Sequence, residues 1–220
     1  MTGASDLPLA AAVPLALAGG YLIGAIPFGL LAGKLRGVDV RKYGSGKTGS
    51  ANVTRSLGVR IGLMVMLLDM AKGAAAVLLA RAISADEAMP ALAGIAAVVG
   101  HNWSLFIGFT GGRGVSTGVG GLLALVPPAG LAAAVVAFST MGLSRYVSLG
   151  SMAGAVVGAL ALAVFVALGQ RPAIDLVYTV VAPLIIWQHR DNIGRLLRGQ
   201  ERRIGQKADV RPSPSQAKDA

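Results

Sequence analysis

The stretch VSTGVGGLLALVPPAGLAAAVVAFSTMGL, residues 115–143, decides the fold. It is apolar for longer than one span needs, because about 20 residues cross a bilayer as a helix. Pro127 and Pro128 lie near its middle. Proline removes a backbone donor and clashes with the preceding helical turn, so a continuous helix is unfavourable there. We therefore expect two short spans that meet at these prolines.

Five further apolar stretches predict the remaining spans. The chain is 54% hydrophobic and only 14% charged, a composition typical of integral membrane proteins. The fold class we predict is all-α, a polytopic membrane bundle of seven transmembrane helices with a short interfacial C-terminal helix. The five stretches cover, approximately, residues 7–33, 61–80, 89–106, 147–168 and 174–188.

The distribution of cations supports seven spans. With the N-terminus outside, seventeen Lys and Arg residues fall on the inner side, Arg81 and Arg171 fall on the outer side, and Lys72 lies in the membrane. This asymmetry follows the positive-inside rule. A single span across residues 115–143 would instead place the basic tail outside. We expect a multi-pass protein of the bacterial inner (cell) membrane with a cytoplasmic C-terminus.

The C-terminal part divides into two segments. Residues 189–205, HRDNIGRLLRGQERRIG, mix aliphatic residues with cations, which predicts a short helix on an anionic membrane surface. Residues 206–220 are polar and contain Pro and Ser, which indicates a disordered cytoplasmic tail. The pattern predicts one domain over residues 1–205.

Composition excludes several chemistries. The chain has no cysteine and two histidines, and its acidic residues are scattered, so we expect neither a metal nor another cofactor. The net charge of +10 is explained by anionic lipid headgroups and phosphate substrates, since no nucleic-acid-binding motif is present. Membrane lipids and small anionic molecules are the expected partners.

The polar stretch KYGSGKTGSANVTRSLG, residues 42–58, is the first candidate site. Glycines allow backbone N–H groups to approach a phosphate, and Lys47 and Arg55 add positive charge. Its Gly44, Gly46 and Gly49 spell G-x-G-x-x-G, but no predicted strand precedes them, so dinucleotide binding is not indicated. A flexible basic loop at the membrane surface is the alternative.

The predicted topology brings four polar elements to the inner face. They are this stretch, the turn of residues 111–114 around Arg113, the turn of residues 145–151, and the tail from His189. A helix starting near Val115 would direct its positive end at the Arg113 turn. Asp69 and Lys72, three residues apart in a span, predict an inward-facing structural pair.

In these elements the sequence resembles the bacterial acyl-phosphate:glycerol 3-phosphate acyltransferase family. The resemblance covers nearly all of residues 21–205 and implies transfer of a fatty acyl group from acyl phosphate to the 1-hydroxyl of glycerol 3-phosphate. The products would be lysophosphatidic acid and inorganic phosphate. The similar motifs are GSGKTGSANVTRSLG (44–58), GHNWSLFIGFTGGRGVST (100–117), RYVSLGS (145–151) and HRDNIGRLLRGQERR (189–203).

The resemblance also implies the site residues. Four positions depart from the family's usual residues: Lys47, Ala51, Ser104 and Arg113. Arginine still suits phosphate at position 113. The implied catalytic residues are Ser45, Arg55, Arg113, His189, Asn192 and Glu201, and the implied substrate-binding residues are Lys47, Asn52, Gly111, Gly112, Gly114, Ser148 and Ser151.

Several alternatives stay open at this point. The hydroxyl proton could pass to His189 or to the departing phosphate, and Ser45 could instead form an acyl-enzyme. Glu201 could pair with Arg113 or Arg55 to shape the pocket. A transporter of a phosphorylated solute would also use glycine turns and cations, although it would place them near the midplane and often in repeats.

Overall fold

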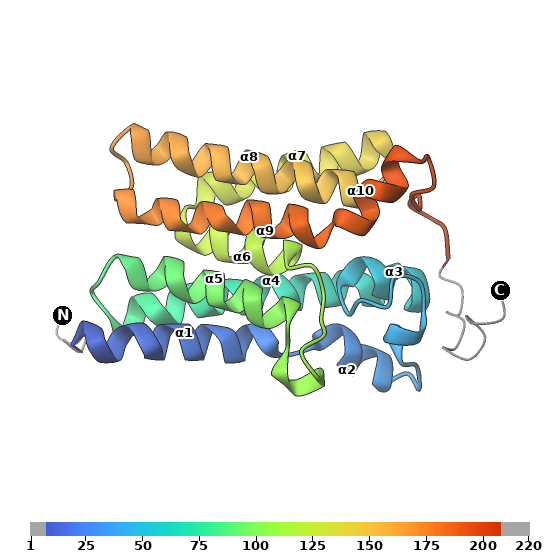
Figure 1. Ribbon diagram of the computed structural model, residues 1–220, viewed down its shortest axis with the longest axis horizontal. Helices are drawn as coiled ribbons and strands as arrows, with labels where there is room; N and C mark the ends of the chain where they lie inside the picture. Colours follow the sequence, from blue (N-terminus) through green and yellow to red (C-terminus); the bar gives the residue numbers. More distant parts are fainter. Residues whose placement is uncertain (1–7, 208–220) are drawn as a thin grey trace.

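The computed structural model describes residues 8–207, which form a helical bundle with its long axis along the helices (Figure 1). Those residues contain no strand, and an isolated antiparallel bridge joins Ser104 and Thr110. One group of helices comprises α1 (Leu9–Ala25), α4 (Val59–Ile83) and α5 (Ala88–Asn102), and α6 (Val115–Leu125) joins it to a second group. The second group comprises α7 (Pro127–Ser144), α8 (Val147–Ala167), the 3-10 segment η3 (Ala173–Val180) and α9 (Val181–Gln188).

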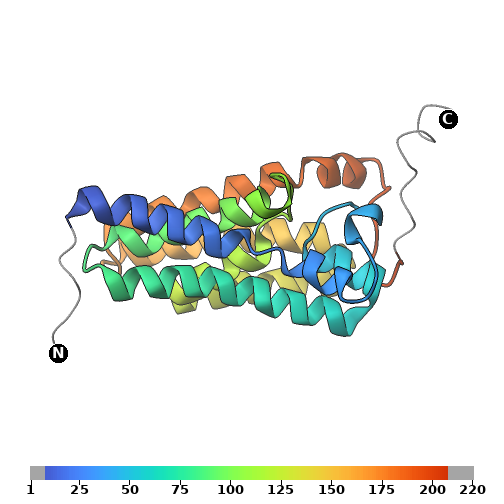
Figure 2. The same ribbon diagram turned by 90° about the horizontal axis from the view of Figure 1, so that it is seen from below.

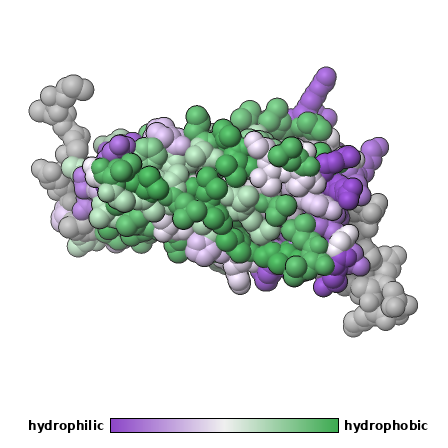
Figure 3. Space-filling view, turned by 90° about the horizontal axis from the view of Figure 1, so that it is seen from above, coloured by the Kyte–Doolittle hydropathy of each residue, from purple (hydrophilic) through white to green (hydrophobic). Residues whose placement is uncertain are grey.

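The apolar segments coincide with the predicted spans. Four of them are long and apolar enough to cross a membrane, namely Ala10–Lys34, Val59–Ile83, Pro127–Ser144 and Val147–Ala167. Three shorter apolar helices are Ala88–Asn102, Val115–Leu125 and Ala173–Gln188. Hydrophobic residues cover the middle of the molecule, and hydrophilic ones gather at the end that carries α10 (Figure 3). The all-α membrane bundle is confirmed, and seven crossings stay a prediction.

The predicted break at Pro127 is confirmed. Helix α6 ends at Leu125, and α7 begins at Pro127, which occupies the first helical position and so lacks only an N–H that would be unpaired anyway. Arg81 donates to the carbonyl oxygens of Ala124 and Leu125 at 3.2 and 3.4 Å. These bonds satisfy the last acceptors of α6 at the junction.

The predicted first span is present, and it is built from two helices. Helix α1 ends at Ala25, and a second helix, α2 (Phe28–Lys34), follows after Ile26 and Pro27. Pro27 has no N–H with which to continue the helix. At the break, Ile26 O accepts from Phe28 N at 3.1 Å and from Lys72 Nζ at 2.8 Å. The third apolar stretch is also shorter than predicted, because α5 ends at Asn102 instead of near residue 106.

Small residues allow the helices to approach closely. Gly20 and Gly24 of α1 lie against Ala93 and Ala97 of α5, where any side chain would strike the α5 backbone. Such small-residue contacts give membrane helices close backbone packing in the absence of a hydrophobic driving force. The two groups of helices meet at a buried apolar cluster that includes Val98 and Leu122.

The polar elements gather at one end of the bundle (Figures 1 and 2). This end carries α2, the basic loop (residues 35–49), α3 (Ser50–Leu57) and α10 (Arg190–Leu197), followed by a segment that we call the C-terminal strap (residues 198–207). Helix α10 confirms the predicted C-terminal helix, and its membrane contact stays a prediction. The predicted disordered tail lies almost entirely outside the described residues.

Candidate active site

A cavity of about 310 Å³ opens at the polar end of the bundle. Its polar part is formed by the basic loop, α3, the glycine turn (residues 111–114), the start of α8, α10 and the C-terminal strap. Its apolar part runs between α4, α6 and α7. Eleven of the thirteen predicted site residues line it: Ser45, Lys47, Asn52, Arg55, Arg113, Gly114, Ser148, Ser151, His189, Asn192 and Glu201.

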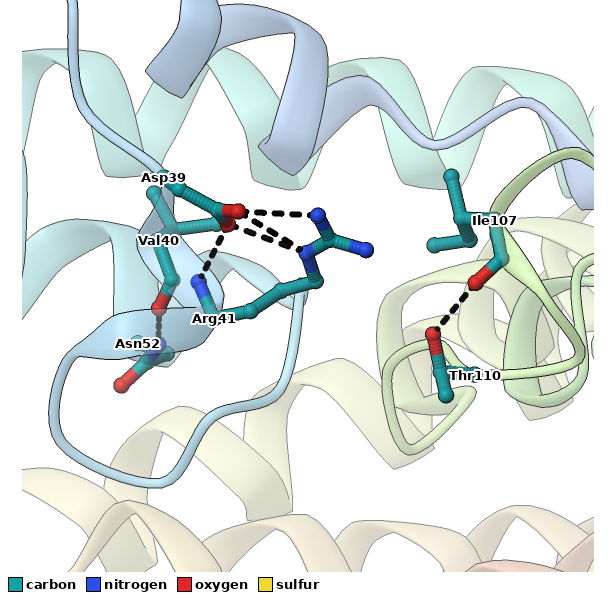
Figure 4. A network of polar contacts seen from close by, with 6 residues as sticks. All are labelled: Asp39, Val40, Arg41, Asn52, Ile107 and Thr110. Atoms are coloured by element: carbon teal, nitrogen blue, oxygen red, sulfur yellow. Dashed lines mark hydrogen bonds and ion pairs between the residues drawn. The ribbon is translucent and has the colours of Figure 1, made fainter. Parts of the chain in front are cut away.

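Asn52 holds the basic loop in shape. Its Nδ2 donates to the carbonyl oxygens of Val40, Tyr43 and Lys47 at 2.9, 3.2 and 2.9 Å, and its Oδ1 accepts from Ser45 N at 3.0 Å. Figure 4 shows the bond to Val40 beside the Asp39–Arg41 pair, which begins the 3-10 turn η1 (Val40–Lys42). The Asn52 amide is therefore occupied by backbone partners, which fix the position of Ser45.

Two guanidinium groups face the cavity with no carboxylate of residues 8–207 in contact. Arg55 comes from α3, and its Nε is buried with no hydrogen-bond partner within residues 8–207. Arg113 comes from the glycine turn and donates through Nε to Gln188 O at 3.3 Å. Burial, then the neighbouring cations Arg195 and Arg55, lower the pKa of Arg113 to about 10. Arginine stays protonated in proteins, so both guanidiniums are suited to binding an anion.

The glycine turn divides into two parts. Gly114 lines the cavity, precedes α6 and has a left-handed φ of +80°, which glycine adopts without strain. Gly111 and Gly112 do not line the cavity. They lie behind its wall against His101 and Asn102, and Gly112 N donates to His101 O at 3.1 Å. These two glycines thus support the turn, while Arg113 and Gly114 face the cavity.

Glu201 joins three elements. Its Oε1 accepts from Ser148 Oγ at 2.9 Å and from Asn192 Nδ2 at 2.6 Å, and its Oε2 accepts from Arg195 Nε at 2.8 Å. These bonds lower the pKa of Glu201 against the opposing effect of burial, so it is ionised at neutral pH. The expected pairing of Glu201 with Arg113 or Arg55 is wrong, because its oxygens bind Arg195, Asn192 and Ser148.

The C-terminal strap is tied to the α7–α8 turn. Ile204 N donates to Arg145 O at 2.8 Å, and Arg145 Nη2 donates to Ile204 O at 3.4 Å. The Arg203 guanidinium lies 5.7 Å from the centre of the Tyr146 ring. Glu201, Arg203 and Ile204 therefore line the cavity from a segment that follows the last apolar helix.

His189 lies at the junction of α9 and α10 and is buried. Its Nδ1 is 2.8 Å from Ile185 O, so in the neutral ring Nδ1 carries the proton and Nε2 is an acceptor. Burial, followed by the nearby Arg113 cation, lowers its pKa to about 4. His189 is therefore neutral at physiological pH.

The two predicted serines on α8 differ in their bonding. Ser148 donates to Glu201, whereas Ser151 Oγ donates to Val147 O at 2.8 Å within its own helix. Both hydroxyls keep acceptor capacity toward the cavity that they line. Within residues 8–207, no group of three His, Cys, Asp or Glu side chains could hold a metal ion.

Among the cavity-wall residues that sequence reasoning did not assign to the site are Asp69, His101 and Arg203. Asp69 and His101 are 32 positions apart in the sequence, and only the packing of α4 against α5 brings them together. His101 occurs in the motif GHNW, whose position beside the glycine turn was the available signal. Arg203 directly follows the predicted Glu201 segment, but its orientation depends on the strap.

Comparison with known proteins identifies the relatives of this chain. A family described as glycerol-3-phosphate acyltransferase matches residues 14–199. Glycerol-3-phosphate acyltransferase 1 of Deinococcus radiodurans is 47% identical over 195 residues, covering 88% of this chain and 96% of the relative. The glycerol-3-phosphate acyltransferase of Rubrobacter xylanophilus is 46% identical over 187 residues, covering 84% and 92% respectively.

Two solved structures share the fold. Both are of PlsY (YgiH), described as an integral membrane glycerol 3-phosphate acyltransferase. The glycerol 3-phosphate form is 38% identical with a TM-score of 0.80 and covers 88% of this chain and 96% of that one. The lysophosphatidic acid form is 37% identical with a TM-score of 0.78 and covers 88% and 95%.

Proposed function

The chain belongs to the glycerol-3-phosphate acyltransferase family, and from that premise we propose that it acylates the 1-hydroxyl of glycerol 3-phosphate with acyl phosphate as donor. It is an integral membrane acyltransferase. Its relatives and structural neighbours are named as acyltransferases, so the transporter alternative has no support. The products of the proposed reaction are lysophosphatidic acid and inorganic phosphate.

The shape of the cavity carries the proposal of an acyl phosphate donor. Arg55 and Arg113 line its polar part, where two phosphate groups would find positive charge. Leu63, Met66 and Phe138 line its apolar part, which suits a fatty acyl chain. A donor with a phosphate at one end of a hydrocarbon chain matches both parts at once.

In the proposed reaction, glycerol 3-phosphate supplies the nucleophile. Its hydroxyl oxygen forms a bond to the acyl carbonyl carbon while the bond from that carbon to the phosphate oxygen breaks. Arg55 and Arg113 hold the phosphates, and Lys47 and the Gly114 backbone border the same space. Holding both reactants in contact and stabilising the developing negative charge supply most of the rate.

The hydroxyl is oriented by acceptors near α10. Asn192 Oδ1 is buried and has no hydrogen-bond partner within residues 8–207, while the bond from its amide nitrogen to Glu201 fixes the direction in which the oxygen points. His189 Nε2 is a second acceptor in the neutral ring. A histidine with a pKa of about 4 holds a proton poorly, so we assign final acceptance of the proton to the departing phosphate.

Ser45 is assigned an orienting role. Its backbone N–H is bound to Asn52, and its Oγ accepts from Lys47 N at 3.4 Å, so the hydroxyl proton can donate to a substrate oxygen. Ser148 and Ser151 border the opposite side of the cavity. We place this end of the bundle at the cytoplasmic face of the inner membrane, following the distribution of cations.

Donor identity is tested with the purified protein in lipid nanodiscs. It is supplied with glycerol 3-phosphate and either acyl phosphate, acyl-CoA or acyl carrier protein, and lysophosphatidic acid and phosphate are measured. We expect equal amounts of both products with acyl phosphate and none with the other donors. Turnover with acyl-CoA alone would overturn the proposal.

The phosphate-binding role is tested with Arg113→Ala. Loss of one buried charge-assisted interaction should lower kcat/KM by about 100-fold. Arg60→Ala removes an exposed cation at the same end of the molecule and outside the cavity, so it serves as the matched control. Equal activity of the two variants would contradict the assignment.

A further inference from the structure

Three charged or ionisable side chains are buried together at the wall of the cavity, which Asp69 and His101 line. Asp69 and Lys72 of α4 form an ion pair of 2.8 Å, and His101 Nδ1 of α5 lies 3.5 Å from Asp69 Oδ1. All three are at most 7% exposed. The mechanism proposed above uses none of them.

One side of this cluster contacts the glycine turn. His101 O accepts from Gly112 N at 3.1 Å, and the His101 ring lies against the Gly112 Cα, where a side chain would overlap the ring. The turn is also joined to the basic loop, since Thr48 N donates to Gly111 O at 3.3 Å. The position of His101 therefore determines where the turn and its Arg113 lie.

The other side of the cluster contacts the break between α1 and α2. Lys72 Nζ donates to Ile26 O at 2.8 Å and lies 5.6 Å from the centre of the Phe28 ring. Helix α2 leads from this break into the basic loop, which carries Ser45 and Lys47. Asp69 binds Lys72 and faces His101. It is thus the common partner of the residues that contact the glycine turn and the break leading into the basic loop, and this turn and this loop are the two elements assigned to phosphate binding.

If the only role of Lys72 were to neutralise Asp69, the contacts of the pair with Ile26 and His101 would not be needed. A buried ion pair is often no more stabilising than apolar residues of the same size, because desolvation offsets the attraction. Here the pair also binds a broken helix and the histidine that supports a catalytic turn. The contacts extend from the pair to both loops of the site.

We propose that Asp69, Lys72 and His101 are positioning residues for phosphate binding, acting through Gly112 on Arg113 and through Ile26 on the basic loop. The inference rests on the proposed function of those two elements. It predicts that disturbing the cluster weakens phosphate binding while leaving the chemical step nearly intact, because no cluster residue is assigned to the reacting atoms.

Kinetics of Asp69→Asn and His101→Gln test this. We expect the KM for glycerol 3-phosphate to rise about tenfold in each variant, with kcat changed by less than about threefold. Asp175→Asn, which alters a buried ion pair at the opposite end of the bundle, is the control and should keep the wild-type KM. KM values equal to that of the control would overturn the proposal.

A double variant tests the contact between ring and turn. Gly112→Ala places a methyl group against the His101 ring, and His101→Ala removes the ring. If both act on one contact, the KM of the double variant is well below the product of the two single effects. Multiplicative effects would contradict the proposal. If no variant at Asp69 or His101 folds, an unchanged KM in Gly112→Ala alone overturns it.

A measurement that does not depend on activity tests the positioning role even if the proposed reaction is wrong. Because the chain has no cysteine, Arg113→Cys introduces a single thiol on the turn. Its labelling rate with a charged thiol reagent should change severalfold when Asp69→Asn is added and stay constant with Asp175→Asn. An unchanged rate in both rejects the positioning role, whatever donor the enzyme uses.

Discussion

Guanidinium groups occur at both ends of the bundle, and their partners differ. At the end opposite the cavity, Arg81 donates to helix carbonyl oxygens, and Arg171 pairs with the fully buried Asp175 at 2.8 Å. At the cavity end, Arg195 pairs with the carboxylate of Glu201, while Arg55 and Arg113 face the cavity. At one end, arginines stabilise the fold by binding carbonyl oxygens and a carboxylate. At the other end, two arginines leave positive charge without a matching carboxylate in the described residues.

The comparison teaches that excess charge, and not the presence of arginine, marks the site. Burial lowers the pKa values of Arg55 and Arg113, and neighbouring cations lower them further: Arg202 and Arg195 act on Arg55, and Arg195 and Arg55 act on Arg113. This is the electrostatic cost of holding cations together before an anion binds. A bound phosphate relieves that repulsion. At the opposite end the arginines are bound by Asp175 and by helix carbonyl oxygens. Matched substitutions at the two ends should therefore separate effects on substrate binding from effects on stability.

The largest difference is expected between Arg55→Ala and Arg81→Ala. Arg55→Ala should lower kcat/KM by about 100-fold, because a buried cation is lost from the polar part of the cavity, where the phosphates are proposed to bind. Arg81→Ala should lower the melting temperature with unchanged KM, because it removes the bonds to the last α6 carbonyls. Steady-state kinetics and thermal unfolding in the same detergent measure both. A raised KM in Arg81→Ala would contradict the distinction between arginines that bind substrate and arginines that stabilise the fold.

A smaller difference is expected between Glu201→Gln and the control Asp175→Asn. Glutamine keeps the size of Glu201 but loses the charge that holds Arg195, so the strap loosens and kcat/KM falls about tenfold. Restoration of activity by Glu201→Asp is not expected, since the shorter side chain cannot reach Ser148, Asn192 and Arg195 together. Wild-type kinetics in Glu201→Gln would show that the strap is not needed.

The smallest effect concerns pH and His189. Its folded pKa of about 4 lies below the ordinary value of 6.5, so the unfolded chain binds the proton more readily between these values. Its contribution to stability is thus complete above about pH 6.5 and is lost as pH falls toward 4. We expect His189→Gln to leave the shape of the kcat/KM profile unchanged between pH 5.5 and 8. A titration near 6.5 that disappears in this variant would restore His189 as the base.

Local patterns were sufficient to predict most of the fold. The apolar lengths predicted the membrane helices, and Pro127 identified the α6–α7 break because proline disrupts a helix through local sterics. The same rule applied to Pro27 would have predicted the α1–α2 break. The stretch around Pro27 has the length and hydropathy of a single span, which hides the break.

The partners of Glu201 and of the Asp69–Lys72 pair depend on tertiary contacts, which the sequence pattern does not indicate. Glu201 was predicted to meet Arg113 or Arg55, but the turn at Gly199 brings it to Arg195, Asn192 and Ser148 instead. The Asp69–Lys72 spacing predicted a pair on one helical face, which is confirmed. Its third member, His101, comes from another helix, and no periodicity in α4 could indicate it.

The attachment of Ile204 to Arg145 has a consequence for how the enzyme is made. Every apolar helix precedes the strap in the order of synthesis, so a chain interrupted after Leu197 would contain the whole membrane bundle yet lack Glu201. Because we propose that Glu201 organises the site, we expect activity to be acquired late in biogenesis, after insertion into the membrane. Prematurely terminated products would occupy the bilayer without consuming lipid precursors.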